Sequence, residues 1–76
     1  PAPDIFLAAA EGVGADIRRC IGIEDAAAGV AAIKAASSLP IGVGKAEDLG
    51  SDIALVSGTS ELTYAYLQSV WEQSGR

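Results

Sequence analysis

Short apolar runs alternate along the chain with polar stretches and with segments rich in small residues. Three runs predict buried β-strands, because each is apolar throughout and lacks the alternation of a sheet with one wet face: residues 20–23, 40–43 and 53–56. Helical patterns fill three other segments. A helix capped by Asp4 should end near Gly12 and Gly14, and a second is predicted over residues 29–36 with Val30 and Ile33 facing inward.

The last helix should start at a cap on Thr59 or Ser60 and continue to about Gln73. Its large side chains fall at i, i+3 and i+7, with one neighbour, which predicts a stripe packed into the core: Tyr64, Leu67, Trp71 and Val70. Residues 16–19 are expected to form a polar connection. Residues 44–52 should form a polar loop in which the pair Glu47-Asp48 is a solvated turn.

The predicted order of elements is helix, strand, helix, strand, strand, helix. This order indicates an α/β fold with about three parallel strands, flanking helices and right-handed crossovers. A sheet this small has two exposed apolar edges, and one of them should pair with strands that this chain lacks.

Composition narrows the choice of function. The 76 residues suffice for one domain, yet 50 % of them are apolar and the mean hydropathy is +0.33, so we expect part of a larger core or an oligomer. The net charge of −5 argues against nucleic acid and anionic membranes as partners. Without histidine, a Ser-His-Asp hydrolase is excluded.

Signals of location and processing are few. No apolar run reaches the roughly 18 residues of a membrane span, and no signal peptide is visible, so a cytoplasmic location is expected. The single Cys20 cannot form an internal disulfide and is interpreted as a small buried hydrophobic residue. The lack of methionine fits either an internal piece of a longer chain or removal of a methionine ahead of Pro1.

The most informative polar feature is the pair Glu24-Asp25, which follows the first predicted strand and precedes the second predicted helix. This position puts both carboxylates at the carboxyl edge of a parallel sheet, where open α/β folds bind ligands. Oxygen-only side chains suit a hard ion such as Mg²⁺, which takes one or two protein carboxylates. The alternative is that the pair only caps the helix and complements its dipole, and the spacing leaves both readings open.

Beyond the general pattern, the chain resembles the carboxyl-terminal half of the core domain in haloacid dehalogenase superfamily phosphotransferases. The strings that carry the resemblance are Pro1-Ala2-Pro3-Asp4-Ile5-Phe6, Gly22-Ile23-Glu24-Asp25, Gly29-Val30 and Ala32-Ile33-Lys34. Within that superfamily, further strings resemble the β-phosphoglucomutase family: Leu39-Pro40-Ile41-Gly42-Val43-Gly44, Glu47-Asp48-Leu49, Asp52-Ile53 and the ending Thr59-Ser60, Thr63, Leu67 and Val70-Trp71. The resemblance covers the whole chain.

This resemblance implies a partial Rossmann-like core from a Mg²⁺-dependent enzyme. Such an enzyme would interconvert β-glucose 1-phosphate and glucose 6-phosphate through an aspartyl-phosphate. Glu24 and Asp25 match the motif that supplies the metal-binding carboxylates. No residue of this chain is expected to be catalytic, and the complete enzyme would take a phosphosugar as its substrate partner.

The departures from the family pattern matter as well. The strand with the nucleophile and acid/base aspartates, the phosphate-binding Ser/Thr and the cap domain are absent, and the family lysine would stand just before Pro1. Ala26 stands where comparable mutases usually carry Ser. The chain is therefore not expected to be competent alone, and it should self-associate or need the missing amino-terminal part. Two alternatives are a non-catalytic remnant or interaction module and part of a sibling phosphatase of the superfamily.

Overall fold

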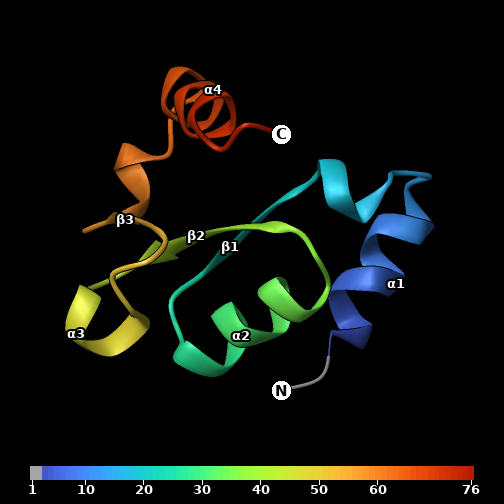
Figure 1. Ribbon diagram of the computed structural model, residues 1–76, viewed down its shortest axis with the longest axis horizontal. Coiled ribbons are helices and arrows are strands. Elements are labelled where there is room, and N and C mark those ends of the chain that lie inside the picture. Colours follow the sequence, from blue (N-terminus) through green and yellow to red (C-terminus); the bar gives the residue numbers. More distant parts are fainter. Residues whose placement is uncertain (1–2) are drawn as a thin grey trace.

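A three-stranded parallel sheet lies between helices in the computed structural model, which describes residues 3–76 (Figure 1). Pro1 and Ala2, which begin the first of the family-like strings, lie outside the described residues. The helices are α1 (Asp4–Gly12), α2 (Ala27–Ala35), α3 (Ala46–Leu49) and α4 (Tyr64–Gln73), and the strands are β1 (Ile21–Glu24), β2 (Leu39–Val43) and β3 (Ala54–Val56). Two 3₁₀ turns span Ile17–Arg19 and Thr59–Glu61. The predicted α/β fold with three parallel strands is confirmed.

The sheet has the strand order β1-β2-β3, so β1 is at one edge and β2 in the middle. Ile23 pairs with Ile41 across β1 and β2, and Gly42 pairs with Leu55 across β2 and β3. Each predicted strand agrees with the structure to within one residue at both ends. Because the three strands are parallel, their carboxyl ends lie together at one end of the sheet, on the left in Figure 1. We call this end the carboxyl edge.

The core lies between α2 and the sheet. Ile33 of α2 and Ile41 of β2 are fully buried, and Val30 is 3 % exposed, which confirms the inward face predicted for this helix. Gly22 permits the close approach: a Cβ at this position would stand 2.7 Å from Ile33 Cγ1. The glycine in β1 thus sets the distance between α2 and the strand that carries Glu24 at its end.

Helix α4 covers the other face of the sheet (Figure 1) and contains no buried residue. Leu67, Val70 and Trp71 are only half-buried, and Tyr64 is 81 % exposed, so the predicted core stripe is wrong at its first position. The predicted caps are wrong too, because Thr59 and Ser60 lie in a 3₁₀ turn. The helix begins after Thr63, whose Oγ1 accepts from the Tyr66 N–H at 3.1 Å.

Two further differences concern short segments. The predicted polar loop over residues 44–52 contains α3, which is anchored by Leu49 at 7 % exposure, while Glu47 and Asp48 are exposed as expected. Cys20 was expected to be buried in the first strand, but it precedes β1, is half-buried, and donates its thiol hydrogen to the Asp16 carbonyl at 3.3 Å.

Within residues 3–76, no helix has the length and hydropathy to cross a bilayer.

Candidate functional site

Glu24 is the last residue of β1, and Asp25 follows it in the turn that leads into α2. The other two strands end at the same edge, where β2 continues into Gly44 and β3 into Ser57. The structure therefore places the predicted acidic pair at the carboxyl edge of the parallel sheet. This is the edge at which open α/β folds bind their ligands.

The side chain of Glu24 folds back over the start of α2. Its Oε1 accepts from the N–H groups of Asp25 at 3.1 Å and of Ala26 at 3.2 Å. Gly29, in the first turn of α2, makes room for this arrangement, because a Cβ there would overlap Glu24 Cγ and Cδ. The spacing of Glu24 and Gly29 thus fixes where the carboxylate lies, and Glu24 is half-buried as a result.

Asp25 differs from its neighbour. Its side chain is exposed, and within residues 3–76 its carboxylate takes part in no recorded hydrogen bond or ion pair. The residue at the N-cap position of α2 is Ala26, which offers no side-chain acceptor. Asp25 is therefore not the helix cap. Of the acidic pair, only Glu24 acts in the manner of a cap, because it accepts hydrogen bonds from two N–H groups of the turn before α2.

No recorded ion pair of the described residues compensates the negative charge of Glu24 and Asp25. Three of the basic side chains pair elsewhere, in Arg18–Asp16 at 3.1 Å, Lys34–Asp52 at 2.6 Å and Lys45–Glu47 at 3.9 Å. Proteins usually bind Mg²⁺ through one or two carboxylates, so the number of uncompensated carboxylates here suits this ion. Residues 3–76 hold no group of three or more potential ligands, so the remaining positions would fall to water, phosphate or another segment.

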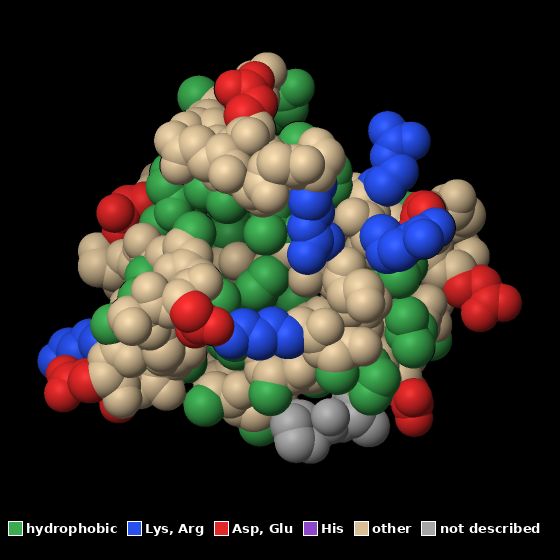
Figure 2. All heavy atoms as spheres, viewed as in Figure 1, with side chains coloured by type: hydrophobic (Ala, Val, Ile, Leu, Met, Phe, Trp, Pro, Cys, Tyr) green, Lys and Arg blue, Asp and Glu red, His purple; other side chains and the backbone are tan. Residues whose placement is uncertain are grey.

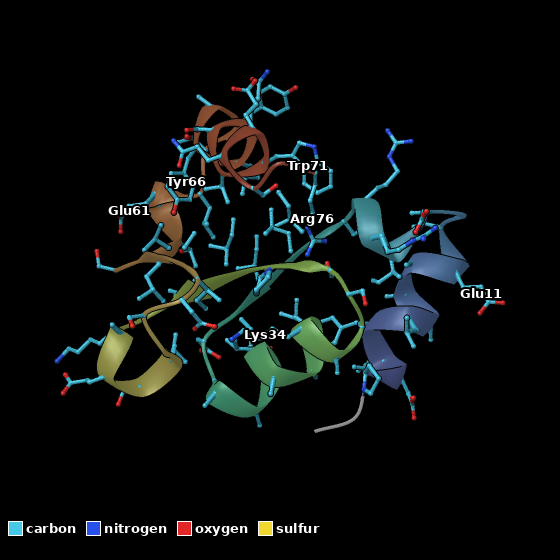
Figure 3. All side chains as sticks on the ribbon, viewed as in Figure 1. Glu11, Lys34, Glu61, Tyr66, Trp71 and Arg76 are labelled. Carbon is cyan, nitrogen blue, oxygen red and sulfur yellow. The ribbon has the colours of Figure 1, made fainter. Side chains whose placement is uncertain are left out.

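Sequence reasoning missed a third carboxylate at this edge, that of Glu61 (Figure 3). Its Oε2 accepts from Ser57 N–H at 2.7 Å, Ser57 Oγ at 2.6 Å and Gly58 N–H at 3.0 Å. The hydroxyl of Ser57 and the two backbone N–H groups hold the pKa of Glu61 below its ordinary value of 4.5. The sequence did contain a signal for this contact. A serine-glycine turn is followed within one helical turn by a glutamate, and this is the spacing of a capping interaction.

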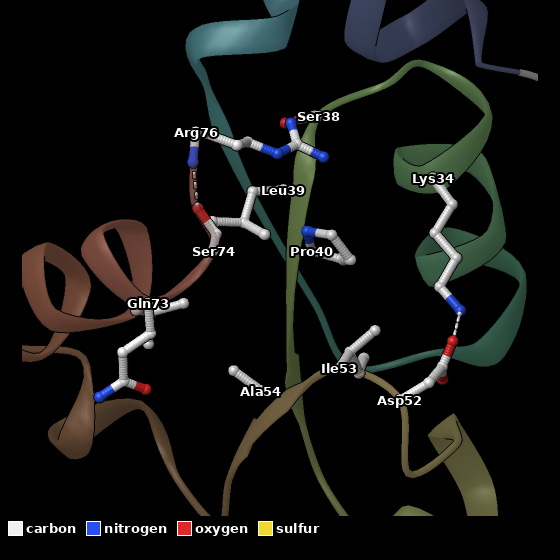
Figure 4. Close-up of a pocket in the computed structure, with 11 residues that line it drawn as sticks. Lys34, Ser38, Leu39, Pro40, Asp52, Ile53, Ala54, Gln73, Ser74 and Arg76 are labelled. Carbon is white, nitrogen blue, oxygen red and sulfur yellow. Dashed lines mark hydrogen bonds and ion pairs between the residues drawn. The ribbon is translucent and has the colours of Figure 1, made fainter.

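A hollow lies at the opposite, amino-terminal end of the sheet, beneath α4 (Figure 4). It has a volume of about 480 Å³, and apolar side chains including Leu39, Pro40 and Val70 line it. The ion pair of Lys34 with Asp52 stands at its rim and lowers the pKa of Asp52. Figure 2 shows hydrophobic side chains gathered below α4 with basic ones beside them. This hollow is separate from Glu24 and Asp25.

Comparison with known proteins shows that the chain is similar to β-phosphoglucomutases. It is 46 % identical over 74 residues to β-phosphoglucomutase of Bacillus subtilis (strain 168), which covers 96 % of this chain and 32 % of that protein. The crystal structure of β-phosphoglucomutase from Clostridium difficile matches 97 % of the chain with a TM-score of 0.91 and 39 % identity, and 33 % of that structure is covered.

A 43-residue part is also 56 % identical to the Arabidopsis thaliana protein SUPPRESSOR OF QUENCHING 1, chloroplastic; it covers 57 % of this chain and 4 % of that protein. No family model matches. The chain is therefore a homologue of β-phosphoglucomutase that spans about a third of the length of the bacterial relatives.

Proposed function

We propose that this chain supplies the metal-binding carboxylates of a Mg²⁺-dependent phosphosugar mutase that interconverts β-glucose 1-phosphate and glucose 6-phosphate through an aspartyl-phosphate. The observation that carries the proposal is the free carboxylate of Asp25 beside Glu24, at the carboxyl edge of a sheet related in structure to β-phosphoglucomutase. In this proposal Asp25 offers an open ligand position. Glu24 offers its second oxygen, while its first oxygen fixes the turn.

The role of the two carboxylates is electrostatic. Phosphoryl transfer needs little covalent chemistry from a protein beyond positioning and the neutralisation of charge on the transferred group. Glu24 and Asp25 would hold a cation at that edge, and the cation supplies the neutralising charge. Gly29 supports them, because it leaves room for the Glu24 side chain above α2.

The proposal assigns no catalytic role to residues of this chain. Among residues 3–76, no aspartate ends a strand together with a second aspartate two positions later, which is the arrangement expected of the nucleophile and the acid/base. That strand would have to pair with the free edge of β1, next to Glu24. Turnover therefore requires a further segment that completes the sheet.

Complementation tests the proposal. We expect no conversion of β-glucose 1-phosphate by the 76-residue chain alone with Mg²⁺ and a bisphosphate primer. Mixing it with the amino-terminal two-thirds of the Bacillus subtilis β-phosphoglucomutase should restore turnover. Asp25→Ala should abolish the recovery, whereas Asp48→Ala, which removes an equal charge from exposed α3, should retain it.

The metal alone gives a second readout. Two carboxylates without substrate phosphate form an incomplete shell, so calorimetry should give a Kd for Mg²⁺ of about 1 mM or weaker. Turnover by the chain alone, in a sample whose intact mass shows nothing longer, would contradict the proposal. So would full recovery of activity with Asp25→Ala.

A further inference from the structure

The hollow beneath α4, at the amino-terminal end of the sheet, has the size and lining of a small-molecule site (Figure 4). Its volume of about 480 Å³ falls within the range of roughly 300–1,000 Å³ that is usual for ligand pockets. Its apolar lining includes Leu39 and Pro40 of β2, Ile53 ahead of β3 and Val70 of α4. Arg76 lines it as well, and we call it the Arg76 hollow.

The guanidinium of Arg76 is held in place by the chain itself. Its Nη1 donates to the carbonyl of Ser37 at 2.9 Å and to the carbonyl of Arg18 at 3.3 Å. Ser37 follows α2, and Arg18 lies in the 3₁₀ turn before β1, so two separate segments fix one end of this side chain. A ligand that met the guanidinium here would lose less affinity to the ordering of a flexible side chain.

These two bonds leave one edge of the Arg76 guanidinium without an acceptor. Within residues 3–76, neither Nε nor Nη2 of Arg76 has a recorded hydrogen bond, and Arg76 takes part in no recorded ion pair. Arg18 shows what such an edge binds, because its Nε and Nη2 donate to the two carboxylate oxygens of Asp16 at 3.2 and 3.1 Å. The same edge of Arg76 therefore suits a carboxylate that comes from outside.

The second cation of the hollow, Lys34, is already paired. Its Nζ lies 2.6 Å from Asp52 Oδ2, and the hydrogen bond from Lys34 holds the pKa of Asp52 below its ordinary value of 3.8. Asp52 is therefore ionised at neutral pH, and it compensates the charge of Lys34. Among the residues that line the hollow, Arg76 is the cation that an acidic ligand would meet.

The Arg76 hollow also lies apart from the edge at which a further strand would join. Two other hollows, of about 430 and 330 Å³, are both lined by Ile21 of β1. The first of these also contains a cation, Arg19, next to Trp71, but a strand paired with β1 would lie beside it. Of the described residues, none from β1 lines the Arg76 hollow, so a strand added at β1 would not fill it.

We propose that the Arg76 hollow binds a small carboxylate with an apolar body. The ligand's carboxylate accepts from Nε–H and Nη2–H of Arg76, and its body packs against Leu39, Pro40 and Val70. A sugar phosphate would fit poorly, because its hydroxyls would face apolar side chains and lack hydrogen-bond partners. The proposal does not rest on the proposed mutase activity, since Glu24 and Asp25 lie at the opposite end of the sheet.

Two probes of the same shape test the proposal. We expect 2-naphthoate to bind the ¹⁵N-labelled chain with a Kd of about 1 mM, measured by amide chemical shifts in an NMR titration. The shifts should saturate and centre on residues that line the hollow, among them Ala54, Val70 and Arg76. 2-Naphthylmethanol, which has a hydroxymethyl group in place of the carboxylate, should bind at the same residues about tenfold more weakly.

Arg76→Gln removes the charge that the carboxylate meets. It should raise the Kd of 2-naphthoate by about tenfold, to that of the alcohol, and leave the Kd of the alcohol unchanged. The alcohol thus separates loss of the anchor from collapse of the hollow. Arg19→Gln is the matched control, because Arg19 is exposed and lines the hollow beside Trp71 instead, and the Kd of 2-naphthoate should not change.

The unmodified chain alone can overturn the proposal. Equal Kd values for the two probes would do so, as would 2-naphthoate shifts that do not saturate or that centre on Arg19 and Trp71. An unchanged Kd of 2-naphthoate with Arg76→Gln would show that Arg76 is not the anchor.

Discussion

Two strands of the same sheet end beside carboxylates, and the two ends differ in what those carboxylates do. After β3, Glu61 accepts hydrogen bonds from Ser57 N–H, Ser57 Oγ and Gly58 N–H. After β1, Glu24 accepts two backbone N–H groups, and Asp25 has no recorded partner within residues 3–76. The first end uses its carboxylate to close a turn, whereas the second leaves one exposed.

The difference identifies the end that is available to a cation. A ligand that took Oε2 of Glu61 would have to break three hydrogen bonds and leave their donors unpaired, so only Oε1 of this side chain is open to a ligand. A cation at Asp25 displaces only water, and the turn beneath it is already held by Glu24. Acidic residues at a strand end are thus poor evidence for a site until the local donors have been counted.

The largest effect is expected from Gly29, at the end where Glu24 and Asp25 lie. Gly29→Ala puts a Cβ where Glu24 Cγ and Cδ lie, so the Glu24 side chain must swing away from the turn. Turnover recovered by complementation should fall by about tenfold or more, the usual cost of losing a group that supports a metal site. The Tm should change little, since Ala favours the helix over Gly.

The matched control is Gly58→Ala. A Cβ on Gly58 meets nothing within 4 Å, and the residue is extended at φ −158° and ψ 163°. Recovered turnover should therefore match that of the unmodified chain. Equal activity of the two variants would contradict the role given to Glu24.

Ala26→Ser tests the N-cap position of α2. Ala26 has the extended backbone of an N-cap, with φ −117° and ψ 142°, but no side-chain acceptor. A serine hydroxyl there could accept from the N–H of Ala28 or Gly29 and should stabilise the chain by about 1 kcal/mol. Thermal unfolding should show a Tm higher by about 4–8 °C. An unchanged Tm would show that a side-chain acceptor at this N-cap adds nothing to the stability of the chain.

The strands and the acidic pair could be predicted from sequence because their signals are local. The run at residues 40–43 is apolar throughout, as a central parallel strand requires, and Ile41 is fully buried. Glu24 and Asp25 were placed at the sheet edge by the strand that precedes them. Val30 and Ile33 follow the helical period and face inward.

The features that were predicted wrongly or missed depend on contacts between segments, which no local sequence pattern encodes. Tyr64 has the spacing of the core stripe, yet it is the first residue of α4, which begins only after Thr63, and it is exposed. The short helix α3 forms because Leu49 is buried, although a four-residue helix has little propensity of its own. The role of Glu61 required its donors, Ser57 and Gly58, to be brought within reach by the 3₁₀ turn.

A pH titration probes the β3 end with the smallest expected effect. Because the folded pKa of Glu61 lies below its ordinary value of 4.5, its hydrogen bonds contribute stability above pH 4.5, and this contribution is lost as the pH falls through the lower folded pKa. Glu61→Gln should lower the Tm by a few degrees at pH 7. The difference from wild type should shrink below pH 4.5. Glu47→Gln on exposed α3 is the control, and it should leave the Tm unchanged. A Glu61→Gln difference that stays constant down to about pH 3 would show that the charge of Glu61 does not hold this turn.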